Sequence, residues 1–540
     1  MESHLSLVQP IELTSKRLEH LICSNDVPLP QEIPFLEKIL AIQRNGVARL
    51  QTQLSLLPND ANRGQLELEL QAAELNALKH AAILSILRWF PAELICEIMA
   101  HTLPHMKTID SYTTAPEAPW WLGHICRRWR AIALGYSPLW SSFGLCGIRD
   151  EMDRISPPTA LEMQLQLTGS ESPLDITLIW KRYDATADSS SLDLLLTQSA
   201  RWRSFRLELG WNTPDYFIPT VLHGIKGRLP LLRTLECISA RHRTASLFGD
   251  VFADLPNLRE LRFTDADVEG ADRDESPPPS VNVPWRQITH FRGRYRTLDD
   301  GFAILRAAPN LVECGLTINQ WHPDHDPAYA PLAPAQIELL CLRRLSTRCY
   351  PPNLLGRLTI PALQELWITF PEAASLLSCI ERSSAYQLVT LVVYQCAGDV
   401  APTLVPILRV LPDLTTIFLE FLDGRNATRD IFDALAVKNR SALQLDLNPL
   451  CPALSRFAVG DLTASHINPF LDMVQSRITS NADTVQKLTF VRAYSNLYRY
   501  AWPEDAVSRV GRMHEAGLDI RLDSGFRTVF EAGYMHRGRP

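Results

Sequence analysis

The chain has 540 residues, of which 46% are hydrophobic and 21% charged, so it is long enough for two or more folding units with a sizeable core. Its net charge of -7 gives no general reason to expect nucleic-acid binding. No apolar run approaches the roughly 18 residues of a membrane span, and no basic segment followed by an apolar block marks a signal peptide. The 11 cysteines are scattered without a C-x-x-C pair, which is typical of reduced thiols. We therefore expect an intracellular protein of the cytoplasm, the nucleus or both, without a disulfide framework.

Residues 1–30 show no periodic pattern, and we expect a loose tail there. Residues 31–85 predict an antiparallel helical hairpin, because apolar residues recur three and four apart on both sides of the turn cluster PNDANRG at 58–64. The expected seam comprises Leu36, Leu40, Gln43, Val47, Leu50, Leu54 and Leu57 on the first helix, and Leu68, Leu75, Leu78 and Ala82 on the second. Two ordinary amphipathic helices packed on the following segment are the alternative.

Residues 86–143 predict a small unit of short helices. The stretch WFPAELICEIMAHTLP begins a helix at Pro91, with Glu93 in its first turn. After a polar loop, WWLGHICRRWRAIALGYSPLW predicts a second helix that Gly135 and Pro138 end. Its expected apolar face comprises Leu122, Ile125, Cys126, Trp129, Ile132, Ala133 and Tyr136. So few residues cannot bury that much apolar surface among themselves, and some of it should meet a partner or the rest of the chain.

The pattern F-P-A-E-L-I-C-E-I-M, a loop, I-C-R-R-W-R-A-I-A and S-P-L-W resembles an F-box. The junction ILSILRWFPAELICEI at 83–98 resembles the fungal, basidiomycete-type form in which a helical hairpin precedes the motif. Phe90 stands where that family usually has leucine, and the loop between the two halves is long. The resemblance implies docking on the adaptor subunit of an SCF-type cullin–RING ubiquitin ligase. The implied adaptor-binding residues are Phe90, Pro91, Leu94, Ile98, Met99, Ile125, Trp129, Leu139 and Trp140.

The alternative for this set is that most of its members form an internal core. For Trp129 and Cys126 we expect a core position, and for Pro91 and Leu94 we expect contact with the partner. Cys126 precedes two arginines, but it shares a face with Ile125 and Trp129, which favours a buried structural thiol over a reactive one.

Residues 228–495 contain a recurring phrase, as in DLPNLRELRFT, with the spacing apolar-x-x-apolar-x-apolar. Most steps between repeats are about 21 to 31 residues long, which resembles leucine-rich repeats with one strand and one helical or irregular return each. The first apolar residues are Leu232, Leu258, Ile288, Leu311, Leu342, Leu363, Leu388, Leu414, Leu454 and Val485. Chance occurrence in a strand-rich α/β protein is the alternative.

The expected fold class is therefore α/β, with the hairpin and F-box-like helices followed by an irregular leucine-rich-repeat solenoid. Residues 144–227 are expected to connect the F-box-like unit to the solenoid and to cap the solenoid with early strands at 173–180 and 202–209. Residues 496–540 form a C-terminal cap and tail. The polar or proline-rich stretches at 269–284 and 321–334 should be loops.

Side chains of a strand alternate between its two faces, so the residue after the second apolar position of each repeat should point outward. These residues are Glu236, Arg262, Arg292, Gly315, Ser346, Trp367, Val392, Phe418, Ala458 and Thr489. Trp367, Val392 and Phe418, with Tyr394 nearby, predict an exposed apolar stripe that binds a target protein. Arg262, Arg292 and Arg294 are further target-binding candidates, and a phosphate could suit them. Coverage of the stripe by a loop or the C-terminal segment is the alternative.

His322 and His325, beside Asp324 and Asp326, have a spacing that suits a metal, but nothing near them completes a ligand shell. We expect no metal and no cofactor. The phosphate-loop, dinucleotide, nucleophile-elbow and zinc-protease motifs are absent from the sequence, so we expect no enzyme. The preferred hypothesis is a substrate receptor that holds an unknown protein target and reaches the cullin through the adaptor, with no nucleic-acid or membrane partner. A non-ligase interaction scaffold and an undetected enzyme are the alternatives.

Overall fold

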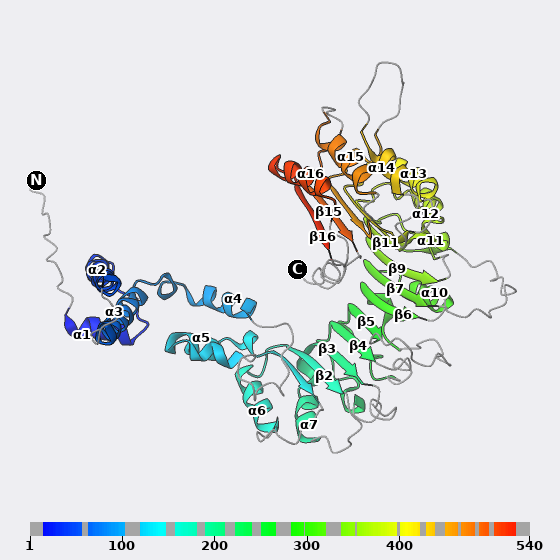
Figure 1. Ribbon diagram of the computed structural model, residues 1–540. Helices are drawn as coiled ribbons and strands as arrows, with labels where there is room; N and C mark the ends of the chain where they lie inside the picture. The colour runs from blue at the N-terminus through cyan, green and yellow to red at the C-terminus, as the bar shows by residue number, and fades with distance from the viewer. Residues whose placement is uncertain are drawn as a thin grey trace, which may run out of the picture. The chain divides into compact units, whose positions relative to one another are not determined.

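The computed structural model describes most of the chain and divides it into two compact units (Figure 1). Unit 1 holds residues 1–179 and 185–201, and unit 2 holds residues 180–184 and 202–540. The division falls inside 144–227, the segment expected to connect. The described residues are 14–56, 63–102, 119–146, 157–180, 189–210, 222–239, 250–265, 282–295, 298–319, 336–350, 354–396, 400–421, 428–437, 449–462, 466–480, 485–495 and 502–524.

Unit 1 begins with a helix where the sequence predicted a loose tail. Helix α1 (Ser15–Cys23) starts at Thr14, whose hydroxyl accepts the Arg17 amide. The Arg17 guanidinium donates to the buried Glu32 carboxylate at 2.9 Å, and Leu21 is fully buried in a cluster with Leu36 and Ile83. The prediction of a loose tail is therefore wrong for residues 15–23, because polar capping and one buried leucine fix this short segment.

Helices α2 (Ile33–Leu56) and α3 (Arg63–Ile83) pack side by side as the predicted hairpin. On α2 the predicted seam is right for the described residues: Leu36 and Leu40 are buried, and Gln43, Val47, Leu50 and Leu54 are half-buried. Leu57 lies outside the described residues. On α3 the predicted seam is on the wrong face, because Leu68, Leu75, Leu78 and Ala82 are exposed. The less exposed side of α3 instead carries Leu66, Leu70, Ala73, Ala77 and His80.

The predicted small unit forms, with one correction. It contains the 3₁₀ turn η1 (Ile86–Arg88), α4 (Ala92–Thr102), η3 (Pro119–His124), α5 (Arg127–Gly135) and η4 (Ser137–Leu139). The second predicted helix is interrupted, since Cys126 has an extended backbone and caps α5. Ile125 therefore lies outside α5 and does not share its apolar face. The core of this unit comprises Ile95, Met99, Leu122, Ala133, Leu139 and Trp140.

The rest of unit 1 is a short α/β segment. Strand β1 (Ser142–Cys146) pairs in parallel with β2 (Leu174–Trp180), and helices α6 (Pro157–Leu167) and α7 (Ser189–Thr197) and the turn η5 (Ser199–Arg201) accompany them. The buried Gln164 donates to the Trp140 carbonyl at 2.9 Å. This bond ties α6 to the end of the small helical unit.

Unit 2 is a long parallel sheet with helices along one side (Figure 1). Its strands follow the order β3-β4-β5-β6-β7-β9-β11-β12-β13-β14-β15-β16, without closing into a barrel. Their bounds are β3 (Trp202–Leu209), β4 (Thr234–Ser239), β5 (Glu260–Asp265), β6 (His290–Tyr295), β7 (Glu313–Asn319), β9 (Arg344–Tyr350), β11 (Glu365–Thr369), β12 (Thr390–Cys396), β13 (Thr416–Phe421), β14 (Arg456–Gly460), β15 (Phe490–Ser495) and β16 (Asp519–Ser524). A separate parallel pair joins β8 (Ile337–Glu338) to β10 (Leu358–Thr359).

Helices and 3₁₀ turns return the chain between these strands. The helices are α10 (Leu298–Ala307), α11 (Phe370–Ala373), α12 (Leu376–Ser383), α13 (Ala401–Arg409), α14 (Thr428–Leu435), α15 (Ile467–Ile478) and α16 (Glu504–Glu515). The turns are η6 (His223–Ile225), η7 (Trp285–Gln287) and η8 (Leu355–Arg357). Within the described part of the chain, no helix combines the length and the apolar character that a bilayer span requires.

The repeated phrase of the sequence sets the strand positions. Nine strands, from β4 to β14 in the main sheet, each begin two residues after the first apolar residue of a repeat, as β5 does after Leu258. The prediction is wrong for the last repeat, where β15 begins two residues after Leu488 and not after Val485. In the sequence VQKL, either Val485 or Leu488 can be taken as the first apolar residue of this repeat. Because Arg456 pairs with Phe490, Leu488 is the residue equivalent to Leu454 of the preceding repeat.

Side-chain amides also connect successive repeats. Asn257 donates to the Pro230 carbonyl at 2.7 Å, Asn310 to that of Arg286 at 2.7 Å, and Gln387 to that of Pro361 at 2.9 Å. Asn257, Asn310 and Gln387 each stand directly before the first apolar residue of a repeat. A carbonyl at the turn of one repeat is thus satisfied by the next repeat.

Candidate interaction surfaces

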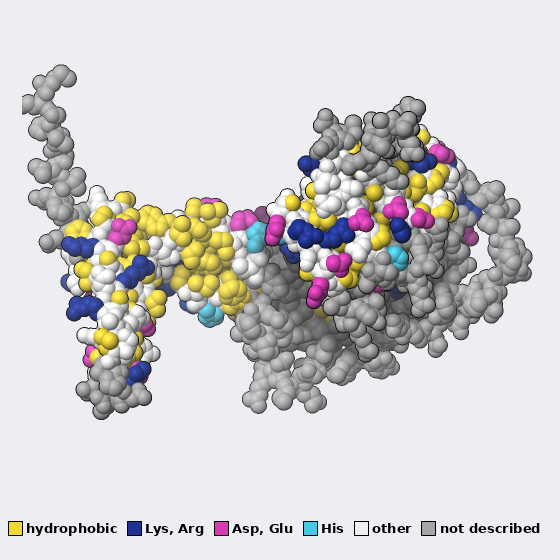
Figure 2. Space-filling view, turned by 45° about the horizontal axis from the view of Figure 1, so that its top comes forward, with side chains coloured by type: hydrophobic (Ala, Val, Ile, Leu, Met, Phe, Trp, Pro, Cys, Tyr) yellow, Lys and Arg dark blue, Asp and Glu magenta, His cyan; other side chains and the backbone are white. Residues whose placement is uncertain are grey.

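Unit 1 exposes apolar side chains at the start of the small helical unit. Ile86, Leu87, Trp89, Leu94 and Ile125 have between 42% and 68% of their surface exposed, and Pro91 is exposed beside them. We call these six residues the apolar ridge. Figure 2 shows hydrophobic side chains gathered on this part of unit 1. A contiguous exposed apolar patch of this kind is typical of a protein-binding surface.

Two arginines hold the backbone under the apolar ridge. Arg128, at the start of α5, donates to the Arg88 carbonyl at 2.6 Å and also to the Phe90 carbonyl. Arg88 is buried and donates in turn to the carbonyls of Leu21, at 2.9 Å, and Asp26, at 3.1 Å. These hydrogen bonds join the start of α5 to residues 88–90, directly before α4. The ridge is therefore presented on a fixed backbone.

The residues predicted to bind the adaptor fall into three groups. Pro91, Leu94 and Ile125 are exposed. Phe90, Ile98 and Trp129 are half-buried, and Phe90 and Trp129 pack against the core of the unit.

The third group, Met99, Leu139 and Trp140, belongs to that core, with at most 2% of their surface exposed. Trp140 donates its indole N–H to the Ala133 carbonyl at 2.7 Å and packs on Trp120 with 4.6 Å between ring centroids. For these three residues the prediction of a direct contact is wrong. Each faces inward on its helix or turn and fills the space between α4 and α5.

Three ridge residues were missed from the sequence. Ile86, Leu87 and Trp89 belong to η1 and its C-terminal cap, a single 3₁₀ turn without the 3.6-residue period on which the prediction relied. The signal that was available is the density of apolar residues in ILSILRWF, directly before Pro91.

Cys126 has a structural role, as expected, although it is only half-buried. Its Sγ accepts a hydrogen bond from the Trp129 amide at 3.4 Å, which caps the first turn of α5. This bond accounts for a cysteine at the point where the predicted helix breaks.

The outward face of the unit 2 sheet carries one aligned row of side chains. Strand pairing places nine of the ten predicted outward residues in this row, and Arg492 takes the place predicted for Thr489. The row runs Arg206, Glu236, Arg262, Arg292, Gly315, Ser346, Trp367, Val392, Phe418, Ala458, Arg492 and Arg521.

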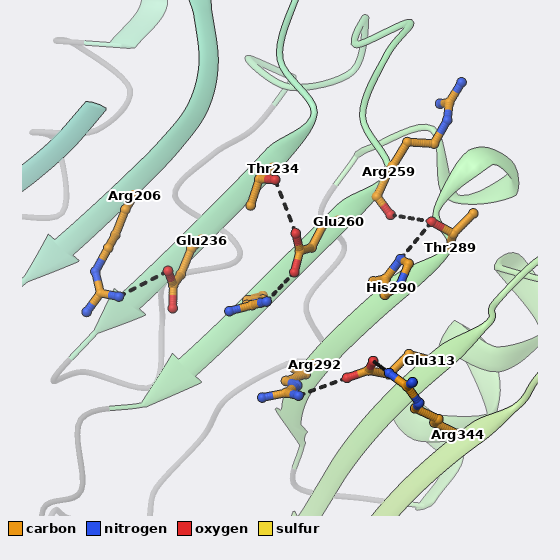
Figure 3. Close-up of polar contacts among 11 residues, drawn as sticks. Arg206, Thr234, Glu236, Arg259, Glu260, Thr289, His290, Arg292, Glu313 and Arg344 are labelled. Atoms are coloured by element: carbon orange, nitrogen blue, oxygen red, sulfur yellow. Dashed lines mark hydrogen bonds and ion pairs between the residues drawn. The ribbon is translucent and has the colours of Figure 1, made fainter. Parts of the chain in front are cut away.

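Arginines and glutamates of the first strands bond to one another, some from the row and some from the positions two residues before it (Figure 3). Arg206 bonds Glu236 at 3.1 Å, and Arg292 bonds Glu313 at 2.8 Å. Arg344 lies within 3.4 Å of Glu313 and 3.3 Å of Glu365. We call this set of charges, with the pair of Arg262 and Glu260, the ion-pair ladder.

The ion-pair ladder changes the role predicted for the arginines. Arg262 and Arg292 each donate to a glutamate of the same sheet, and Arg294 lies half-buried two residues further along β6. Burial alone would raise the pKa of Glu313, but the Arg292 hydrogen bond and nearby positive charges lower it below its ordinary value. A bound phosphate would have to compete with these carboxylates. The suggestion of a phosphate site is therefore not supported here.

Gly315 gives Arg292 the room for this contact. A Cβ atom at Gly315 would lie 3.1 Å from Cγ of Arg292, closer than side chains ordinarily pack. The glycine that interrupts the row of side chains thus lets the guanidinium cross toward Glu313 on the neighbouring strand.

The predicted apolar stripe is present but buried. Val392, Tyr394 and Phe418 have at most 8% of their surface exposed, and Trp367 is half-buried. They cluster with Tyr494 of β15, and the Trp367 and Tyr394 rings lie 6.3 Å apart. The prediction of an exposed stripe is therefore wrong for three of the four residues. Large rings on adjacent parallel strands pack on one another, which an outward position in the sequence pattern does not reveal.

A carboxyl group lies next to this aromatic cluster. Glu420 follows Phe418 by two residues on β13, and its pKa is raised by burial and by the negative charge of Asp461, against the opposing effect of Arg348. The Arg348 guanidinium also lies 5.2 Å from the Tyr394 ring centre. This end of the sheet therefore combines aromatic and charged groups, whereas the ion-pair ladder lies in the first half.

His322 and His325, whose spacing was considered for a metal, lie outside the described residues. Among the residues that the structure describes, no group of three or more histidine, cysteine or acidic side chains is placed to hold a metal ion. Neither a protein-family model nor a curated protein matches the chain. The function is therefore argued from the apolar ridge and the sheet of unit 2.

Proposed function

We propose that this protein is a non-catalytic substrate receptor of an SCF-type cullin–RING ubiquitin ligase, acting in the cytoplasm or the nucleus. Its small helical unit is an F-box-like module that docks on the adaptor subunit. Unit 2 is an irregular leucine-rich-repeat solenoid that holds a target protein. The single observation that carries the proposal is the apolar ridge, exposed on a backbone that Arg88 and Arg128 fix.

The geometry of the ridge supports a protein partner over self-packing. Leu94 is exposed although Ile95 and Met99 on the same helix are fully buried, so α4 has one apolar side for the core and one for solvent. Trp89 and Ile125 extend the solvent side beyond α4. Tryptophan is enriched among the residues that contribute most of the binding free energy at protein interfaces, which makes Trp89 the principal anchor of the ridge.

The regular strand spacing of unit 2 supports the repeat assignment. Each repeat adds one parallel strand, and amide–carbonyl bonds such as Asn257 to Pro230 tie it to its neighbour. Such a row of strands offers an extended surface, and we place the target on its outward face. Binding there would hold a lysine of the target near the ubiquitin-charged enzyme and raise its effective concentration, without bond chemistry by this chain.

The adaptor contact is tested by co-purification. Trp89→Asp combined with Leu94→Asp should weaken adaptor binding at least about tenfold, because two exposed anchors become charged. The matched control is Leu340→Asp, which changes a leucine of unit 2 that is 64% exposed. Binding that survives the double substitution would refute the docking site. If the adaptor co-purifies but the cullin does not, the chain is an interaction scaffold and not a ligase subunit.

Target binding is tested in the same cells under proteasome inhibition. Arg344→Glu should release a bound target and leave the adaptor in place, since Arg344 is 53% exposed and pairs with two glutamates of the ion-pair ladder. Arg429→Glu, on an exposed helix position of the same unit, serves as the control. A target retained by Arg344→Glu would place the contact elsewhere on unit 2.

A further inference from the structure

Helix α3 has two apolar sides, and α2 accounts for only one of them. Leu66, Leu70, Ala73, Ala77 and His80 are half-buried or buried and recur four and three apart, as a helix seam does. Leu68, Leu75 and Leu78 are between 55% and 67% exposed, and Ala82 is exposed after them. At 100° per residue these two sets point in nearly opposite directions. We call Leu68, Leu75, Leu78 and Ala82 the α3 stripe.

The hairpin buries little without a further partner. Between Ala41 and Lys79, none of the residues that the structure describes is fully buried. Most of the stability of a helix in a protein comes from packing its apolar side on another element. The α3 stripe is therefore where an additional helix would contribute most.

The charges beside the α3 stripe indicate what that helix is. If Leu68, Leu75 and Ala82 take heptad position a, then Gln71 and Leu78 take position d. Glu67 and Glu74 then fall at position g, and Lys79 falls at position e. Glu74 accepts a hydrogen bond from Gln51 of α2 at 3.1 Å, which places its carboxylate between α2 and the stripe.

We propose that the α3 stripe pairs in parallel with the α3 stripe of a second copy of this chain. In a parallel pair, g residues of one helix face e residues of the other, so Glu74 meets Lys79 of the second copy and Lys79 meets its Glu74. In an antiparallel pair g faces g, and Glu74 would face a glutamate. The charge pattern therefore complements itself in the parallel arrangement alone. Gln71 at a core position makes the pair weaker and fixes its register.

Self-association is tested on the full chain by sedimentation velocity. The wild type should pass from monomer to dimer with a dissociation constant between about 1 and 100 μM, as two short heptads allow. Leu75→Glu with Leu78→Glu should raise that constant at least about tenfold, because the charges would have to be buried at the dimer seam. Both residues are exposed in the single chain, so circular dichroism should be unchanged. Leu340→Glu is the matched control and should dimerise as the wild type does.

A charge exchange tests the orientation. Glu74→Lys alone and Lys79→Glu alone each place like charges together and should raise the dissociation constant about fivefold. Mixing the two variants restores both opposite-charge pairs and should give a heterodimer as tight as the wild-type pair. Gln51→Ala controls for the lost hydrogen bond to Glu74 and should leave dimerisation unchanged.

Three results would overturn the inference. They are a chain that stays monomeric above about 100 μM, a dimer insensitive to the leucine substitutions, and charge variants that fail to rescue one another. The measurement uses this chain alone, so it stands or falls separately from adaptor binding. A dimer would place two receptors in one assembly and strengthen binding to a target with two contact sites.

Discussion

Arg477 shows how this fold satisfies backbone carbonyls with a side chain that the sequence pattern does not single out. It is fully buried in α15, and its guanidinium donates to the carbonyls of Leu435, at 2.8 Å, and Cys451, at 3.2 Å, as well as to that of Leu450. Burial lowers its pKa to about 10, so it stays charged at neutral pH. Its partners lie at the end of α14 and in the segment before β14, 26 to 42 positions earlier in the chain, and no local spacing predicts them.

Replacing Arg477 should destabilise unit 2 strongly. Arg477→Met keeps much of the side-chain volume but leaves three carbonyls without their donor, so the free energy of unfolding should fall by about 3 kcal/mol or more. Urea denaturation followed by tryptophan fluorescence measures this change. Arg429→Ala, at an exposed ion pair on α14, should cost less than about 0.5 kcal/mol. Equal losses for the two variants would contradict the assigned role.

Glu313 should make stability depend on pH. Its pKa is lowered in the folded protein, so its contribution is present above the unfolded value and is lost as pH falls through the folded value. Glu313→Gln should therefore destabilise the protein at neutral pH and flatten the loss of stability below about pH 4.5, the ordinary glutamate value. Urea midpoints measured at several pH values test this, with Glu515→Gln at an exposed position of α16 as the control. If the loss of stability below about pH 4.5 is the same in Glu313→Gln as in the wild type, Arg292 does not stabilise this carboxylate.

At the scale of elements, the sequence predicted position and orientation correctly wherever an element has a single apolar side. Leucines such as Leu258 and Leu311 recur with the strands, and burial of that one side fixed both strand position and outward row. The sequence was insufficient at α3, where leucines line two opposite sides and periodicity alone cannot tell which side meets α2. It was also insufficient at the apolar ridge, because one 3₁₀ turn has no period, and at Tyr394, whose burial depends on Tyr494 of a strand that is not adjacent.

Two glycines should respond in opposite ways to alanine. A Cβ atom at Gly293 in β6 would lie 2.7 Å from Phe291 and 2.9 Å from Tyr295, so Gly293→Ala should cost about 1–3 kcal/mol through overpacking. Gly46 lies inside α2 with nothing within 4 Å of that position, so Gly46→Ala should stabilise the hairpin by about 0.5–1 kcal/mol. Thermal and urea denaturation of both variants provide the comparison. Equal effects of the same sign would contradict both assignments.

At the scale of the whole molecule, the sheet of unit 2 has its last strand covered by one helix. Helix α16 packs on β16, with Met513 and Ala506 buried beside Leu518 and Ile520. Without β16 the hydrogen-bonding edge of β15 would be open to another chain. The C-terminal segment predicted as a cap therefore contains a complete helix and strand, although its capping role remains a prediction.

Removing residues 502–540 should make the protein associate. The exposed β15 edge and the apolar side that α16 covers would both be available, so size-exclusion chromatography should show large species and bound hydrophobic dye should increase. Removing residues 525–540 alone keeps α16 and β16 and is the matched control. If the truncated chain elutes as the control does, the edge of β15 does not need β16 and α16 to prevent association.

The ion-pair ladder also bears on how fast a partner can arrive. Each guanidinium of the ladder lies beside a carboxylate, so the electric field of this face falls off within a few ångströms and offers little long-range guidance. A partner of this face would approach by unassisted diffusion, and its encounter rate would change little with ionic strength. Selection between different partners would then arise only at contact, when a side chain of the partner must replace an arginine or a glutamate in an existing ion pair.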